Sequence, residues 1–99
     1  MAAVNGVLKA LSNPNRRKVY QIICRVGGGA RGKGITIEQI CKHAGMKQPA
    51  VSHHVAHLSS AGLVERRKSR WWVYCTAAAE GLAELSQFVK DPARFPMDE

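Results

Sequence analysis

The stretch from Thr36 to Leu58, TIEQICKHAGMKQPAVSHHVAHL, decides the fold of this chain. Apolar residues recur at helical spacing on both sides of Gly45, in the sets Ile37, Ile40, Cys41, Ala44 and Val51, Val55, Leu58. Thr36 and Gln39 fit a capping box, so we expect a helix that begins at Thr36 and ends at Gly45. The residues MKQ leave room only for a tight turn before a second helix over 48–61. The stretch therefore predicts a helix-turn-helix unit.

The flanking segments extend this unit on both sides. Two helices are expected before it, over 4–11 and from Pro14, which follows Asn13 as a capping residue, to Gly27. After it, LVERRKSRWWVYCTA predicts a β-hairpin over 63–76 with its turn at 68–70. A last helix is expected over 77–89. We therefore predict a mainly α fold with a β-hairpin (α+β), a winged helix-turn-helix, as one domain over 1–91 with a loose tail at 92–99.

Composition narrows the range of partners. Fifteen Lys and Arg against seven Asp and Glu give this 99-residue chain a formal charge of +8, which favours nucleic acid first and acidic membrane second. No apolar run is long enough to span a bilayer, and MAAVNGVLKALSN lacks the pattern of a signal peptide. Three cysteines at wide spacing predict reduced thiols rather than a disulfide framework. A cytoplasmic protein follows.

Together these residues resemble the ArsR/SmtB family of winged helix-turn-helix repressors. The resemblance rests on three runs in order: Leu11, Asn13, Pro14, Arg16; then Gln48, Val51, Ser52, His54, Leu58, Gly62, Leu63, Val64; then Tyr74. Val55 departs from the pattern, since Leu is commoner there. The resemblance implies a homodimeric, DNA-binding transcriptional regulator, with its dimer interface on the first and last helices.

Three of the four histidines lie on the second helix of the predicted unit. At 100° per residue its outward face carries Pro49, Ala50, His53 and His57, with Gln48 and Ser52 bordering the N-terminal end. That end meets base edges in helix-turn-helix proteins, and Gln and Ser can bond to bases. His53 and His57 are interpreted as donors to phosphate or base. His54 lies at the flank of the buried stripe and is interpreted as partly structural and as a contact to backbone phosphate. A metal site is the alternative, but the zinc-type spacing lacks its Glu and a third ligand nearby.

Basic residues form two further clusters. In the hairpin, Arg66, Arg67, Lys68 and Arg70 are interpreted as DNA-backbone or minor-groove contacts, with a merely solvated turn as the alternative. Trp71 and Trp72 should point to opposite faces of a strand, so that one of them is core. Arg16 begins a cluster at the start of the second helix. Cations there oppose the helix dipole, and a phosphate would relieve this.

The sequence leaves several alternatives for the signal that would control DNA binding. The metal sites familiar in ArsR/SmtB relatives lack their cysteines and histidines here, so we predict no metal and no cofactor. Cys24 and Cys75 are a candidate redox or persulfide-sensing pair if their Cα atoms lie within about 7 Å. A regulator with no ligand is the other possibility. Gly27 to Lys33 fits G-x-x-x-x-G-K, but Gly34 stands where a phosphate loop needs Ser or Thr, and no nucleophile–base pair indicates an enzyme.

The prediction is therefore a sequence-specific DNA-binding regulator, a homodimeric repressor that binds a palindromic operator with half-sites about one helical turn apart. Helix 48–61 would lie in the major groove and the wing at 63–76 beside it. A winged helix used for protein contacts is the alternative, and it predicts a recognition helix and a hairpin that are both poor in charge.

Overall fold

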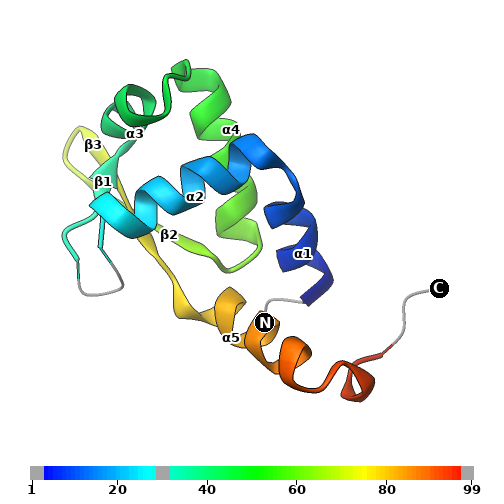
Figure 1. The fold of residues 1–99 in the computed structure, drawn as a ribbon. Coiled ribbons are helices and arrows are strands. Elements are labelled where there is room, and N and C mark those ends of the chain that lie inside the picture. The colour runs from blue at the N-terminus through cyan, green and yellow to red at the C-terminus, as the bar shows by residue number, and fades with distance from the viewer. Residues whose placement is uncertain (1–3, 29–31, 97–99) are drawn as a thin grey trace.

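Five helices and a three-stranded antiparallel sheet make up the described residues, 4–28 and 32–96, of the computed structural model (Figure 1). Along the chain they are α1 (Val4–Ser12), α2 (Pro14–Val26), β1 (Ile35–Thr36), α3 (Ile37–Ala44), α4 (Gln48–Ser60), β2 (Val64–Ser69), β3 (Trp72–Ala77) and α5 (Ala79–Lys90). The predicted α+β winged helix-turn-helix is confirmed. Residues 29–31 of the glycine-rich segment lie outside the described residues.

The helix ends follow the capping residues of the sequence. The Arg16 backbone N–H donates to Asn13 Oδ1 at 3.0 Å at the start of α2. At the start of α3, the Gln39 N–H donates to Thr36 Oγ1 at 3.2 Å, and the Thr36 N–H donates to Gln39 Oε1 at 3.0 Å. This reciprocal pair is the predicted capping box. Gly45 ends α3 in the left-handed region, with φ of 67°, which turns the chain toward α4.

The helix-turn-helix unit packs against α2. Val51, Val55 and Leu58 of α4 are buried together with Val19 and Ile23 of α2 and Ile40 of α3, in one core. The Lys18 ammonium of α2 also donates to the Ala44 carbonyl oxygen at 3.0 Å. A cation at this helix end stabilises the last carbonyls of α3. The inner face of α4 is therefore held by packing, and its other face is left outward.

One strand was not predicted. The sheet order is β1-β3-β2, in which Ile35 pairs with Cys75 and Thr36 with Tyr74. The partner of this two-residue strand lies far along the chain, and two residues carry no alternation pattern of their own. The unpredicted strand joins the start of α3 to the wing, so the wing is fastened to the helix-turn-helix at its base.

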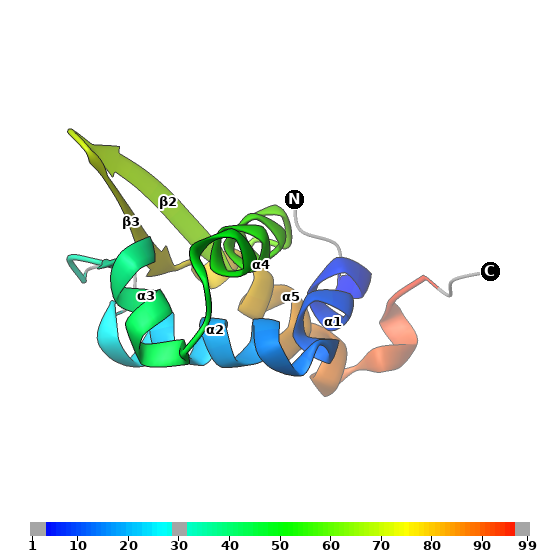
Figure 2. The ribbon, with the colours of Figure 1, turned by 90° about the horizontal axis from the view of Figure 1, so that it is seen from above.

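The tip of the wing differs from the prediction. Lys68 and Ser69 belong to β2, and Ser69 pairs with Trp72, which leaves Arg70 and Trp71 as a two-residue turn. The expectation that one tryptophan is core is wrong, because Trp71 is 86% exposed and Trp72 is 45% exposed. The hairpin extends beyond the helical body, and its tip finds no core there to pack against (Figure 2).

The first and last helices pack against each other (Figure 1). α5 begins at Ala79 rather than Ala77, because Ala77 pairs with Val64 in the sheet. In the expected tail, residues 92–94 form a 3₁₀ turn and the Phe95 ring meets Phe88 at 5.4 Å between centroids; residues 97–99 lie outside the described residues. Within the described ranges, no helix is both long and apolar enough to cross a membrane.

Candidate nucleic-acid interface

The outer face of α4 is open to solvent at the residues that the sequence singled out. All of the predicted contact residues are exposed except His54 and Arg16, which are half-buried; the exposed ones are Gln48, Pro49, Ala50, Ser52, His53, His57, Arg66, Arg67, Lys68 and Arg70. They lie on α4 and on the wing, which follow each other in the chain. Polar and basic groups therefore lie on two adjacent elements.

The N-terminal end of α4 carries the positive partial charge of the helix dipole, and no acidic side chain compensates it. Lys47 precedes the helix without a side-chain hydrogen bond to it, and no acidic residue lies in the first turn. The first N–H groups of a helix attract anions, and phosphate is a favoured one. Gln48 and Ser52 lie exposed at the same end. This end can therefore bind a phosphate oxygen and present an amide and a hydroxyl to base edges.

The three histidines of α4 form a cluster. The ring centroids of His53 and His57 are 4.5 Å apart in an edge-on arrangement, and those of His53 and His54 are 6.0 Å apart. His54 Nδ1 is buried and has no hydrogen-bond partner in the described part of the chain. Exposed imidazoles at this spacing can donate to neighbouring phosphates or bases.

Arg16 links this cluster to α2. Burial first, and then the charges of Arg16, His53 and His57, lower the pKa of His54. The Arg16 charge is the main cause that lowers the pKa of His57, followed by slight desolvation, His53 and Lys9. Arg16 Nε is itself buried without a hydrogen-bond partner among the described residues. Several cationic groups thus repel one another here, and an anion would relieve that repulsion.

The neighbours of Arg16 are already engaged. The Arg17 guanidinium donates to the Leu11 carbonyl oxygen at 2.7 Å, and Lys18 donates to Ala44 as described above. Both cations thus have helix carbonyls as partners. Of the basic cluster at the start of α2, only Arg16 lies against the histidines of α4.

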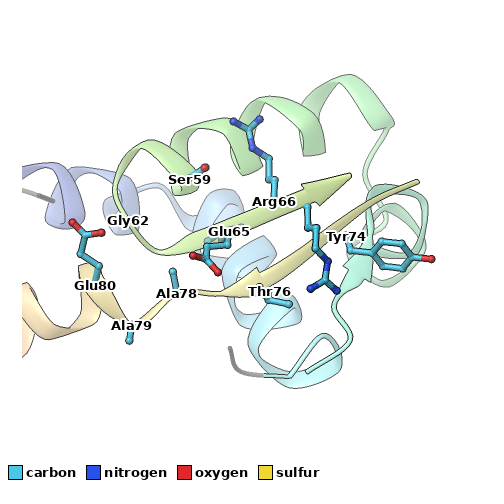
Figure 3. A pocket seen from close by; sticks show the side chains of 11 residues that line it. Ser59, Gly62, Glu65, Arg66, Tyr74, Thr76, Ala78, Ala79 and Glu80 are labelled. Carbon is cyan, nitrogen blue, oxygen red and sulfur yellow. The ribbon is translucent and has the colours of Figure 1, made fainter. Parts of the chain in front are cut away.

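A hollow of about 620 Å³ lies where the end of α4, the base of the wing and the start of α5 meet (Figure 3). The Arg66 side chain projects toward α4 in this view. A bound molecule would touch the wing and α5 together. The lining residues are Ser59, Gly62, Val64, Glu65, Arg66, Arg67, Tyr74, Thr76, Ala78, Ala79 and Glu80.

The candidate redox pair differs in exposure. Cys24 is exposed on α2, whereas Cys75 of β3 is completely buried. Burial raises the pKa of the Cys75 thiol to about 11, partly offset by the Arg66 charge. A thiol that stays protonated and inaccessible is a poor nucleophile, so this environment does not favour a thiol switch. Among the described residues, His, Cys, Asp and Glu form no group of three or more that could hold a metal ion.

Comparison with known proteins agrees with this arrangement. The family model described as a helix-turn-helix domain matches residues 11–67. The transcriptional repressor SdpR of Bacillus subtilis is 28% identical over 71 residues, which are 72% of this chain and 71% of SdpR. The homodimeric winged helix-turn-helix DNA-binding domain Mb0332 of Mycobacterium bovis, a possible ArsR-family regulator, is 31% identical with a TM-score of 0.66, over 92% of this chain and 78% of that one. This chain belongs to the ArsR/SmtB family.

The fold of an ArsR-family regulator is also seen at lower identity. The structure of RHA00566 is 21% identical and has a TM-score of 0.74, over 95% of this chain and 94% of that one. ArsR/SmtB proteins are transcriptional regulators, a class that typically has no enzymatic activity.

Two features of this ArsR/SmtB chain were missed in the sequence. Lys9 of α1 contributes to the charge around His57, although it lies far from it in the chain. Trp71 lies exposed at the wing tip, and no Asn-Gly or Asp-Gly pair marks the turn that places it there.

Proposed function

We propose that the chain is a homodimeric, sequence-specific DNA-binding repressor. The proposal rests on one observation above all: α4 has a buried inner face and a polar outer face, and a basic hairpin follows it directly. An exposed helix of this kind fits the DNA major groove, and a basic hairpin beside it fits the backbone. The DNA-binding domain Mb0332 and the repressor SdpR support the same function.

Base preference is assigned to α4 and general affinity to the wing. Gln48, Ser52 and His53 would meet base edges, while Arg66, Arg67, Lys68 and Arg70 would neutralise phosphates. His57, His54 and Arg16 would contact the DNA backbone beside α4, where one DNA strand passes from α4 toward the start of α2. Phosphate contacts set affinity without regard to sequence, whereas base contacts discriminate.

The dimer is assigned to the outer faces of α1 and α5. Leu8 of α1 is 42% exposed, and Leu82 and Val89 of α5 are 43% and 69% exposed. Large apolar side chains gathered on two packed helices favour a protein contact. The homodimeric state of Mb0332 supports a second copy as the partner. A twofold dimer would place two copies of α4 on an imperfect palindrome, with half-sites about one helical turn apart.

The two alternatives are weaker. A protein-interaction module predicts a recognition helix and a wing that are both poor in charge. α4 contains no Lys or Arg, but the wing carries four exposed cations between positions 66 and 70, which disfavours this alternative. A Cys24–Cys75 switch needs a reactive thiol on both sides, and Cys75 is buried. A DNA partner and reduced cysteines also support the cytoplasmic location that we predict.

The test is a titration of the protein against the DNA upstream of its own gene and against a scrambled duplex, at several salt concentrations. A specific complex that weakens steeply with salt is expected, because phosphate neutralisation releases counterions. The titration is repeated with reduced protein, with oxidised protein and with added zinc. Loss of the complex on oxidation alone would favour the thiol switch, and loss with zinc would favour a metal effector. Equal binding to both duplexes with little effect of salt would exclude the repressor.

A further inference from the structure

The wing tip carries a tryptophan where a soluble hairpin normally carries a polar residue. Trp71 occupies the two-residue turn between Ser69 and Trp72 and is 86% exposed. It is the most exposed of the large apolar side chains in the described chain. Covering an exposed apolar ring removes apolar surface from water, so contact of this ring with a partner is favoured.

The backbone of the same turn is strained. Arg70 has φ of 57°, and it is the one non-glycine residue with positive φ among the described residues. Glycine or asparagine usually fills such a position because a side chain there crowds the backbone. Here an arginine fills that position, and a tryptophan follows it in the turn, so two large side chains lie at the tip although the backbone at Arg70 favours a smaller residue.

The surroundings of Trp71 are cationic. Arg67, Lys68 and Arg70 are all exposed and lie within four positions of it, and this part of the hairpin contains no acidic residue. The cations favour a polyanionic partner, and the aromatic ring favours a partner that also has apolar surface between its charged groups. Duplex DNA has both, because its grooves are lined by deoxyribose between two phosphate strands.

The connection to α4 decides which groove is in reach. Three residues separate the end of α4 at Ser60 from the start of β2 at Val64, and the hairpin extends beyond the helical body (Figure 2). With α4 in the major groove, a hairpin attached so closely reaches the neighbouring minor groove. Apolar side chains that enter a minor groove can wedge against a base step and partly unstack it.

We propose that Trp71 is an apolar minor-groove contact, which the wing cations guide between the phosphate strands beside each half-site. This inference rests on the proposed DNA-binding function and adds a specificity determinant to it. Base steps that unstack easily would be preferred at the flank, at positions that α4 does not touch. An anionic membrane surface is the rival partner for a ring among cations, and the test includes it.

The two tryptophans of the chain both lie in the hairpin, so tryptophan fluorescence, excited selectively over tyrosine, reports on the wing alone. The variant Trp72→Phe keeps Trp71 as its single tryptophan, and Trp71→Phe is the matched control that keeps Trp72. With saturating duplex, the emission of Trp72→Phe should change and its quenching by acrylamide should fall at least about twofold, as expected for a ring removed from water. The control should change less.

Affinity gives the second measurement. Trp71→Ala should weaken binding to a labelled duplex about tenfold, within the range known for aromatic contacts to nucleic acid, and should leave the salt slope unchanged because no cation is removed. Because the ring is exposed, the melting temperature should stay the same, which separates a lost contact from a lost fold. Replacing a flanking G·C pair by inosine·C removes the 2-amino group from the minor groove and one base-pair hydrogen bond, and leaves the major-groove edge unchanged. It should alter the affinity of the wild type but not of Trp71→Ala.

The outcomes are distinguishable from failure of the proposed function. If anisotropy shows specific duplex binding while Trp71 stays fully accessible to acrylamide and Trp71→Ala binds equally well, this inference is wrong and the repressor stands. If the wild type never prefers its own upstream duplex, the proposed function fails and takes the inference with it. If Trp71 emission shifts with vesicles of phosphatidylglycerol and phosphatidylcholine but not with duplex, the tip binds lipid and the inference is overturned.

Discussion

α4 and the wing follow each other in the chain, yet different interactions determine where each of them lies. α4 is positioned by an apolar stripe that is almost completely buried, so its outer residues can vary without moving the helix. The wing is positioned by strand pairing and by two buried residues near its base, Val64 and Cys75, and its tip contacts no core. The comparison teaches that α4 can carry base recognition on a helix held by the core, whereas the wing presents charge and an exposed ring on a hairpin whose tip lies outside the core.

The largest expected difference between the two regions is in stability. Leu58 of α4 is fully buried, so Leu58→Ala should lower the free energy of unfolding by about 3 kcal/mol. Trp71→Ala removes a larger side chain but should change it by less than about 0.5 kcal/mol, since the ring is exposed. Urea denaturation at equal protomer concentration measures both. Similar losses in the two variants would mean that the wing tip is packed in solution, and the comparison would fail.

The next effect separates recognition from affinity. Gln48→Ala should reduce discrimination at one base position by about 1–2 kcal/mol, because a bidentate amide–adenine contact is lost, and His53→Ala should act in the same direction. Binding to a panel of operators with single base changes measures this. Gln21→Ala, on the exposed face of α2, is the matched control and should leave the panel unchanged. An unaltered preference in Gln48→Ala would remove this residue from the base contacts.

Where a residue's environment is local, the sequence predicted it. The capping box at Thr36, the cap at Asn13, the turn at Gly45 and the α4 stripe all depend on neighbours within a few positions, and all are confirmed. The exposed outer face of α4 follows from the same helical geometry. What these residues bind remains a prediction.

Where the environment comes from distant parts of the chain, prediction failed. β1 is two residues long and depends on a partner in β3. The wing turn contains no glycine to mark it, so the sequence predicts the turn at 68–70, one to two residues too early. The expectation that one tryptophan is buried is wrong for the same reason. The bond between Lys18 and Ala44 and the charge of Lys9 near His57 join segments more than twenty positions apart, which no local pattern reveals.

A smaller effect sharpens the role of the wing. Arg67→Ala should weaken binding to specific and scrambled duplexes alike, and the slope of log affinity against log salt should flatten by about one unit, since one phosphate contact is lost. Arg25→Ala removes an exposed arginine near the end of α2 and is the control for net charge. If Arg67→Ala leaves both affinity and slope unchanged, the wing does not contact the DNA backbone.

The smallest expected effect is on pH dependence, and it comes from the α4 histidines. Since the pKa values of His54 and His57 are lowered in the folded protein, the unfolded chain binds more protons between those values and the ordinary 6.5. The free energy of unfolding of the unbound protein should therefore fall as pH is lowered through this range, and recover as pH rises above 6.5. Arg16, Lys9 and His53 are the charges that face these rings.

The affinity for DNA should have the opposite pH dependence to the stability of the unbound protein. Phosphates beside the rings would raise the pKa values of His54 and His57, so complex formation would take up protons, and affinity should increase about threefold from pH 8 to pH 6. Anisotropy titrations at constant ionic strength, with the melting temperature followed in parallel, measure both trends. The double variant His54→Gln, His57→Gln should lose most of the increase. His43→Gln, which removes the one histidine outside α4, should keep it. Equal pH dependence in both variants would mean that the α4 histidines lie away from the phosphates.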